Sequence, residues 1–482
     1  MSRLTRRDFI KGSVAAMATI TIAGTKSSGR VLGANETIRI GVAGLNGRGA
    51  SHVGAFAPMQ DVQITYLIDP DTRTYRARQQ QIGNRSNPRT VQDVRRCLED
   101  RNVDAISIAT PNHWHSLMTI WAAQAGKHVY VEKPCSHNVH EGRIAVAMAR
   151  RHNVIVQHGT QSRTEGPWAN IIEAIKSGRY GRLLVSRAIV YKLRNSIGNR
   201  PTGNPPTELD FNLWLGPAQR TDYHANLVHY NWHWFWAFGN GDIGNQGVHQ
   251  MDIARWAING ATLPRSVVSV GGRFGYTDQG ETPNTQVTLM DFGDSKLIFE
   301  VRGLSCRHYR GQGTGNDSSN HFHLEQGIIS GNRFYPRGEG QGEAIPNMNP
   351  RRGPGGGSHF ANFIAAVRSG RRADLNADIE EGHYSSALCH LANISYQMGT
   401  NAPFAPRTRA FGDNRDAIET LERMEAHLSG PPHNLRLADL QLKVGPLLQV
   451  QARTENFGDN ATANRYLTRQ YREGFVVPDR VG

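Results

Sequence analysis

Short apolar runs alternate with amphipathic stretches along the first third of the chain. The runs are rich in Ile and Val, as buried strands are, and lie at 37–43, 62–68, 103–110, 128–131 and 154–158. The stretches between them fit helices, one from about Ala50 and another from Ser116 to Ala125. Strands that alternate with helices favour a parallel sheet with right-handed crossovers. We therefore predict an α/β domain over residues 35–160.

The pattern becomes mixed after residue 160, which predicts a second α/β domain over residues 161–404. Two alternating runs flank Gly293-Asp294 and predict a β-hairpin. Further elements are expected as helices at 168–176, 359–369 and 379–398 and as a strand at 183–191, with a Gly- and Pro-rich loop at 194–208. Residues 405–482 are assigned to a C-terminal extension, expected to be helical and to pack back on the body.

The first 34 residues are typical of an export signal. Arg6 and Arg7 precede Phe9-Ile10-Lys11 and an apolar stretch over 14–23. The arginine pair resembles a twin-arginine signal, which a receptor reads as an address. We expect export by this route, to the periplasm or beyond, with removal of residues 1–34 and no membrane span afterwards. A basic N-terminal helix is the alternative.

A glycine-rich turn, residues 44–49, follows the first predicted strand. Glycines allow the backbone to approach a pyrophosphate, and the following helix N-terminus supplies amide donors. Asn46 stands at the middle glycine of the usual GxGxxG pattern, and Asn tolerates a left-handed backbone. Asp69 ends the second strand, where a carboxylate can bind both ribose hydroxyls and favour NAD. Because Arg73 is near, NADP stays an alternative cofactor. The alternative for Asp69 is that it is only a turn residue without a role in binding.

Polar residues also follow the later strands of this domain. Thr110, Asn112 and Lys133 would lie beyond the carboxyl ends of parallel strands, where ligands bind in such sheets. In a closed, cationic site a lysine has a lowered pKa and can act as an acid or base. The alternative is a surface lysine on a turn that Pro134 ends.

The 44–49 turn, Ala109–His115 and Glu132-Lys133-Pro134 together resemble the Gfo/Idh/MocA oxidoreductases, over about residues 36–400. The resemblance implies a Rossmann domain followed by an α/β domain whose open, largely antiparallel sheet often mediates oligomer contacts. It implies a homodimer or homotetramer that oxidises or reduces a sugar or sugar derivative with NAD(P), with Lys133 near the nicotinamide. The residues expected at the cofactor are Gly44, Asn46, Gly47, Arg48, Gly49, Asp69, Thr110, Pro111, Asn112, His115, Glu132 and Lys133.

The segment 241–252 is expected to complete the catalytic group. The resemblance makes His249 a proton relay beside Lys133, and positions four apart share one helix face, which would bring residue 245 to the same pocket. The family usually has Asp at this position, where the chain has Asn245. Asn245 can orient a hydroxyl but cannot take a proton. Asp242 or Asp252 compensates, or else each caps a helix or forms an internal pair.

Further substrate contacts are expected on both sides of the domain boundary. Gln161 and Arg163 follow the last Rossmann strand, within reach of a substrate. Trp232 and Trp234 offer flat aromatic faces on which a sugar can stack, although a core or interface cluster is an equal alternative.

Composition removes several classes of protein. The net charge is +14, but the basic residues are scattered, so we expect no nucleic-acid partner. The 4 Cys lie far apart, which excludes a disulfide scaffold and a cysteine zinc site. Histidine pairs such as His113 and His115 lack carboxylates at ligand spacing, so no metal is expected.

Three functions remain open. The first is an oxidoreductase whose NAD stays bound and is recycled internally. The second is a glycoside-cleaving enzyme that uses a bound NAD transiently, through oxidation, elimination, hydration and reduction. The third is a sugar-binding protein without catalysis, which the loss of the carboxylate at 245 allows.

Overall fold

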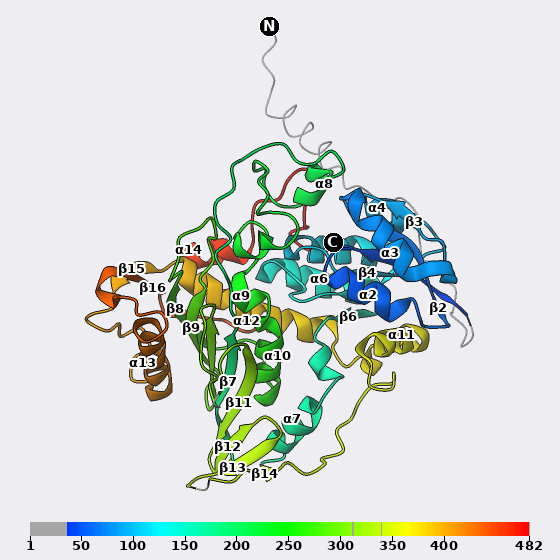
Figure 1. Ribbon diagram of the computed structural model, residues 1–482. Coiled ribbons are helices and arrows are strands. Elements are labelled where there is room, and N and C mark those ends of the chain that lie inside the picture. Colours follow the sequence, from blue (N-terminus) through cyan, green and yellow to red (C-terminus); the bar gives the residue numbers. More distant parts are fainter. Residues whose placement is uncertain (1–35, 311–312, 339, 482) are drawn as a thin grey trace.

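The computed structural model describes residues 36–310, 313–338 and 340–481, so the predicted export signal lies outside the described residues. The first domain is built on a six-stranded parallel sheet in the order β3-β2-β1-β4-β5-β6 (Figure 1). This is the Rossmann order, and it confirms the predicted parallel sheet. Its strands are β1 (Ile38–Ala43), β2 (Val62–Ile68), β3 (Arg89–Val91), β4 (Ala105–Ile108), β5 (His128–Val131) and β6 (Val156–His158).

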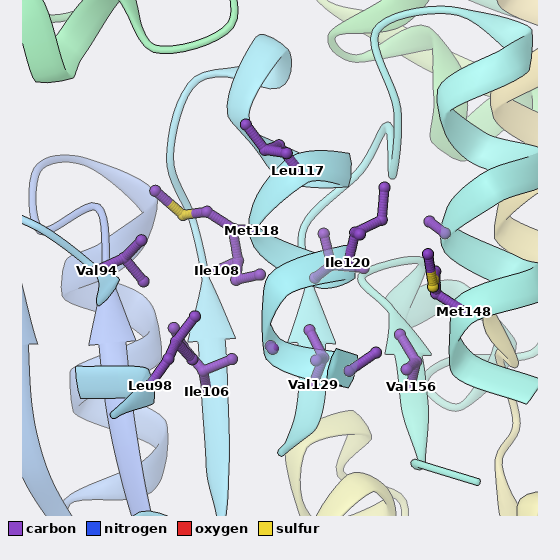
Figure 2. Close-up of a cluster of buried hydrophobic side chains, with 14 of the residues drawn as sticks. Val94, Leu98, Ile106, Ile108, Leu117, Met118, Ile120, Val129, Met148 and Val156 are labelled. Atoms are coloured by element: carbon purple, nitrogen blue, oxygen red, sulfur yellow. The ribbon is translucent and has the colours of Figure 1, made fainter. Parts of the chain in front are cut away.

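Helices α5 (Asn112–Gln124) and α6 (Val139–Arg151) cover one face of this sheet. Figure 2 shows strand residues such as Ile106 and Val129 beneath Leu117 and Ile120 of α5, all in one buried cluster. Helix α5 begins four residues before the predicted Ser116, directly after Pro111, whose extended backbone precedes the first turn. Because of this early start, Asn112 and His115 lie in the first turn of the helix at the sheet edge.

The other face of the Rossmann sheet is completed by a helix from the second half of the chain. Helix α11 (His359–Ser369) packs beside α2 (Arg48–Phe56), and Phe360 stacks on Tyr130 of β5 with ring centroids 4.7 Å apart. Phe363 of α11 lies in the same cluster as Ile38 of β1. The predicted boundary at residue 160 therefore does not separate two independent units. Smaller elements of this domain are α3 (Tyr75–Ile82) and α4 (Arg95–Leu98).

The second domain contains an eleven-stranded sheet, in which every pair is antiparallel except β7 with β10. This confirms the largely antiparallel sheet implied by the family resemblance. Its strands are β7 (Leu183–Tyr191), β8 (Ser266–Gly272), β9 (Thr285–Asp291), β10 (Lys296–Arg302), β11 (Asp317–Leu324), β12 (Gly327–Ser330), β13 (Arg333–Pro336), β14 (Glu343–Ala344), β15 (Thr400–Pro403), β16 (Gln441–Val444) and β17 (Leu448–Gln449).

Helices cover both faces of this second sheet. Helices α10 (Gly247–Ala257) and α12 (Ile379–Gln397) pack on one face, where Leu297 and Phe299 of β10 are buried. Helix α13 (Arg415–Ser429) packs on the opposite face against Ile298, the residue between them. The remaining helices are α7 (Trp168–Lys176), α8 (Phe211–Leu215), α9 (Gly241–Gly244) and α14 (Ala461–Asn464).

The extension 405–482 packs back on both domains, although only part of it is helical. Strands β16 and β17 join the second sheet, so this domain does not end at residue 404. The final segment returns to the Rossmann domain, where Phe475 and Val477 enter its core cluster (Figure 1). No helix in the described part of the chain combines the length and apolarity needed to cross a membrane.

Candidate active site

A large cavity opens at the carboxyl ends of the Rossmann strands, where the second domain meets them. It holds about 1240 Å³ of space, including the solvent at its mouth. Open α/β sheets bind ligands at this edge. The predicted residues that line it are Gly44, Asn46, Gly47, Arg48, Asp69, Thr110, Pro111, Asn112, His115, Glu132, Lys133, Trp232 and Asn245.

The glycine turn leaves room for a ligand on one side and has no room for a side chain at Gly44 or Gly49 on the other. A Cβ on Gly44 would lie 2.5 Å from the Ala109 carbonyl oxygen, and one on Gly49 would lie 1.8 Å from the Gly44 oxygen. Gly47 has φ +46° at the N-cap of α2, and a Cβ there would meet nothing within 4 Å. The packed side of the turn thus requires glycine, while the open side exposes the start of α2, an arrangement that fits a diphosphate.

Thr110 provides a second sign that the cavity accepts a polar ligand. Its side chain is buried, lines the cavity, and has an Oγ1 without any hydrogen-bond partner among the described residues. Buried hydroxyls are nearly always bonded in folded proteins, so a ligand oxygen or amide at this position would complete the site.

Asp69 lies at the cavity wall with its carboxylate directed toward the glycine turn. Oδ2 accepts a hydrogen bond from Leu45 N at 2.8 Å, and Oδ1 accepts one from Asp71 N at 2.9 Å. Burial raises the pKa of Asp69 to about 6, although these backbone bonds oppose the shift. Arg73 does not line the cavity, because its guanidinium bonds the Asp71 carboxylate. The carboxylate at 69 is therefore not neutralised by Arg73, which favours NAD over NADP at this wall.

Glu132 is the ionic centre of the Rossmann side. Its Oε1 accepts hydrogen bonds from Arg48 Nε at 2.7 Å, from His52 Nε2 at 3.1 Å and from Gln161 Nε2 at 3.2 Å. Burial alone would raise the pKa of Glu132, but the His52 hydrogen bond and the Arg48 charge hold it well below the ordinary value. Glu132 thereby fixes the glycine turn to the end of β5.

Lys133 crosses from the Rossmann edge to the second domain. Its Nζ donates to the Asn245 carbonyl oxygen at 3.1 Å, and its side chain lines the cavity. Burial lowers the pKa of Lys133, and Arg48 lowers it further, whereas Glu132 opposes both. The amine therefore lies in the cavity with a reduced affinity for its proton, as proton exchange with a ligand requires.

His115 holds the two loops that carry Thr110 and Lys133. Its Nδ1 lies 2.6 Å from the Pro134 carbonyl oxygen, and its Nε2 lies 2.7 Å from the Thr110 carbonyl oxygen. Burial lowers the pKa of His115, and a neutral imidazole donates from only one nitrogen. Both nitrogens face protein carbonyls, so His115 acts on the cavity by positioning its wall.

The predicted relay of residues 245 and 249 takes a different form. The helix is interrupted: α9 ends at Gly244 with Asn245 as C-cap, and α10 begins at Gly247. The two residues therefore do not share one continuous helix face. Asn245 lines the cavity, whereas His249 is partly buried and is not a lining residue. Burial, with the nearby Lys133 charge, lowers the pKa of His249 to about 3.

Two predicted substrate contacts from the end of β6 belong to the protein interior instead. Arg163 pairs with Asp252 at 2.9 Å and with Glu381 at 3.0 Å. Gln161 donates to Tyr130 and Glu132. Neither residue is among those that line the cavity, so their predicted contact with substrate stays a prediction. The amide of Gln161 and the guanidinium of Arg163 donate their hydrogen bonds to protein groups.

The second tryptophan and the two candidate carboxylates are also used internally. Trp234 lies outside the cavity, with the Arg194 guanidinium 5.1 Å from its ring centroid. Asp242 binds that arginine through both oxygens, at 2.7 and 2.8 Å. Asp252 is held by Arg163, so neither carboxylate is free to replace the missing acid at position 245.

An aromatic wall faces the Rossmann edge from the second domain. Trp232 stacks on His233 with ring centroids 3.6 Å apart, and Tyr230, about half exposed, lines the same side. The sequence expectation named Trp232 but gave no site role to Tyr230, His229 or His233, which stand beside it in the chain and also line the cavity. The position of Trp232 within a dense aromatic segment was the available signal.

Within residues 36–310, 313–338 and 340–481, no group of three His, Cys, Asp or Glu side chains is arranged to hold a metal ion.

The parallel sheet, the glycine turn and the cavity at their junction define a dinucleotide-binding Rossmann protein with a second α/β domain. A profile of the oxidoreductase family with an NAD-binding Rossmann fold matches residues 38–160, and the C-terminal α/β domain of the same family matches residues 192–273. Over these two segments the chain is similar to the Gfo/Idh/MocA family.

Curated relatives are similar over part of their length. Glycosyl hydrolase family 109 protein 2 of Shewanella sp. (strain ANA-3) is 27% identical over 253 residues, 47% of this chain and 52% of the relative. Myo-inositol 2-dehydrogenase of Thermotoga maritima is 28% identical over 150 residues, 31% of this chain and 44% of the relative. The chain thus spans about half the length of the curated relatives it matches.

Solved structures resemble the fold more completely. The WlbA dehydrogenase from Bordetella pertussis, in complex with NADH and UDP-GlcNAcA, aligns with TM-score 0.54 and 21% identity over 73% of this chain and 94% of its own. Levoglucosan dehydrogenase, in complex with NADH and levoglucosan, aligns with TM-score 0.54 and 17% identity over 74% and 96%. At these identities the likeness shows the fold alone.

Proposed function

We propose that the protein is an NAD-dependent oxidoreductase that acts on a sugar or sugar derivative and keeps its cofactor bound. The observation that carries the proposal is the position of Lys133. Its amine lies in the cavity between the glycine turn and the aromatic wall, with a lowered pKa and one main-chain acceptor. Two solved structures that share the fold are complexes with NADH and with UDP-GlcNAcA or levoglucosan, which supports the proposal.

The residues present fit a nicotinamide dinucleotide. The turn 44–49 and the start of α2 would hold the diphosphate, Asp69 would accept from ribose hydroxyls, and Thr110 with Asn112 would face the nicotinamide end. When bound, this cofactor supplies a reversible two-electron oxidation of an alcohol. The chain supplies closure from water, orientation and a place for the proton.

Lys133 would hold that proton. A neutral amine at Nζ can accept the proton of a substrate hydroxyl, and the resulting ammonium keeps Asn245 O as an acceptor and Glu132 as a nearby negative charge. His249 would act from behind this group, and Asn245 would orient the hydroxyl. The faces of Tyr230 and Trp232 would contact the sugar ring.

The second candidate function is glycoside cleavage with a transiently used NAD. The specific observation in its favour is the match to glycosyl hydrolase family 109 proteins, which covers about half of this chain. The same proton-bearing Lys133 would serve both outcomes. Release of a free aglycone without net cofactor reduction distinguishes cleavage from simple oxidation.

We further propose export through the twin-arginine route and assembly into a homo-oligomer, a dimer or tetramer. The paired Arg6 and Arg7 support export, and the family resemblance supports assembly. Helix α13 covers part of one face of the second-domain sheet. The contact between subunits would therefore use the strands of that face that α13 leaves uncovered. Fractionation of the source cells and light scattering of the purified protein test these two proposals.

The experiment that tests the function compares Lys133→Met with Lys176→Met, which removes an exposed lysine from α7. A panel of aldoses, inositols and aryl glycosides is screened with the wild type, and turnover is measured on the best substrate. Lys133→Met should lose roughly 10²–10⁴-fold in turnover, the usual worth of positioned acid–base catalysis. It should keep NAD binding, and Lys176→Met should match the wild type. Unchanged turnover in Lys133→Met contradicts the proposal, and a wild type that binds sugars without turnover supports the non-catalytic alternative.

A further inference from the structure

A second cavity lies where α6, α12 and the C-terminal extension meet. It holds about 560 Å³ of space, including its open mouth, and shares no lining residue with the first cavity. Its polar lining residues include His137 and Asn138 before α6, His390 and Asn393 of α12, and Arg465 and Arg469 of the extension. None of these residues is used by the proposed function.

Two α12 residues that line this cavity carry buried polar atoms without a hydrogen-bond partner in the described structure. His390 and Asn393 are each 3% exposed. Asn393 donates from Nδ2 to the Asn240 carbonyl oxygen at 2.8 Å, which leaves Oδ1 as an acceptor without a partner in the described structure. His390 bonds Ser136 Oγ through Nε2 at 3.1 Å, and its Nδ1 has no partner there. Buried polar atoms are normally bonded, so both point to a ligand.

Arg469 lines this cavity and determines which nitrogen of His137 carries the proton. Its Nη1 donates to the Ala237 carbonyl oxygen at 2.9 Å and lies 3.1 Å from His137 Nδ1. A guanidinium can only donate, so Nδ1 of His137 accepts and its Nε2 carries the proton. This Nε2 is buried and has no hydrogen-bond partner among the described residues. The wall therefore offers an N–H donor beside a cation.

The charge of Arg469 is only partly balanced by the protein. Burial lowers the pKa of Arg469, and Glu141 opposes that shift. The Glu141 carboxylate, however, accepts from His137 N, Asn138 Nδ2 and Tyr471 OH, and it does not line the cavity. Within the described residues Arg469 forms no ion pair, so a ligand carboxylate could approach the guanidinium directly.

We propose that this second cavity binds a small hydroxy acid of the sugar-acid class. The carboxylate would accept from Arg469 and from His137 Nε2, as charge-assisted hydrogen bonds require. A neighbouring hydroxyl would donate to Asn393 Oδ1. Trp236 also lines the cavity and offers an aromatic face to the carbon chain. The proposal does not depend on catalysis at the first cavity.

Calorimetric titration of the full chain tests the proposal, with D-gluconate, D-glucose, acetate and inorganic phosphate as probes and NAD present throughout. Gluconate should bind more tightly than the neutral sugar or acetate. Arg469→Gln should weaken gluconate by roughly 10-fold or more, the usual effect of losing a charge-assisted hydrogen bond. Arg436→Gln removes an exposed arginine of the extension and should change nothing. Lys133→Met should also bind gluconate as the wild type does, because it alters only the first cavity.

A second variant separates the hydroxyl contact from the charge and remains informative if Arg469→Gln does not fold. Asn393→Leu removes the acceptor and keeps the cation, so it should weaken gluconate but leave acetate unchanged. The proposal is overturned if gluconate does not bind, or if its binding is lost in Lys133→Met and kept in Arg469→Gln. It is also overturned if phosphate and acetate equal gluconate, which would mean a general anion site only.

Discussion

Replacing Glu132 by Gln should reveal how far the cavity depends on one buried charge. Glu132 is 3% exposed, and its carboxylate accepts hydrogen bonds from His52, Arg48 and Gln161. Removing one partner from a buried charged group costs about 3–5 kcal/mol. The amide keeps an acceptor oxygen, so we expect the lower end, about 3 kcal/mol of unfolding free energy. At roughly 2–4 °C per kcal/mol in domains of similar size, the melting temperature should fall by about 6–12 °C.

The same variant should change the proton affinity of the site. Glu132 raises the pKa of Lys133 and that of His249, so Glu132→Gln lowers both. If a neutral Lys133 is the base, the acid limb of the pH–rate profile should move to lower pH. Glu300→Gln is the matched control, because Glu300 is also fully buried and bonds Tyr191 and Arg302 in the second sheet. It should lose stability without moving the limb.

The pH dependence of stability gives a further check on Glu132. Its pKa is held below the ordinary value, so its contribution is complete above the unfolded pKa and is lost as the pH falls through the folded one. The stability gap between wild type and Glu132→Gln should therefore be widest near neutral pH and narrow in acid. The reasoning is refuted by a variant that melts with the wild type at pH 7, or by an acid limb that moves to higher pH.

Two further predictions concern single residues of the cavity. Asn245→Asp places a carboxylate near His249 and should raise the pKa of that imidazole. If His249 governs the acid limb of the pH–rate profile, that limb should move to higher pH. NMR titration of the ring checks the shift, and an unchanged ring pKa contradicts it. When the pH drops below about 6, Asp69 becomes protonated, and the affinity of the wild type for NAD should decrease. Asp69→Ser should lose this pH dependence, and its affinities for NAD and NADP should differ less than those of the wild type. Calorimetry with both cofactors tests the role of Asp69. A wild type that binds NADP more tightly than NAD would contradict that role.

The Rossmann half could be predicted because its signals are local. Apolar runs define the strands, and the glycine turn must be glycine where a Cβ on Gly49 would strike the backbone of Gly44. Lys133 follows from its position at the end of a predicted strand. These features depend on residues that are close together in the sequence.

The failures involve partners that are distant in the sequence. The position of Arg163 after the last Rossmann strand does not reveal its partners Asp252 and Glu381, which lie 89 and 218 residues away. No pattern indicated that α11 would complete the Rossmann sheet. The break at Asn245 was missed because helical spacing cannot show that the backbone leaves the helix there. The second cavity likewise depends on Arg469 meeting His137 from 332 residues away.

The most direct test of the account is to identify the small molecule that the cavity holds. The protein is purified without added cofactor, dialysed and denatured, and the released molecules are identified by mass spectrometry. The account predicts NAD in its oxidised or reduced form, at close to one molecule per chain. A folded protein that releases no dinucleotide, and that binds none when NAD is titrated into it, would contradict the central claim.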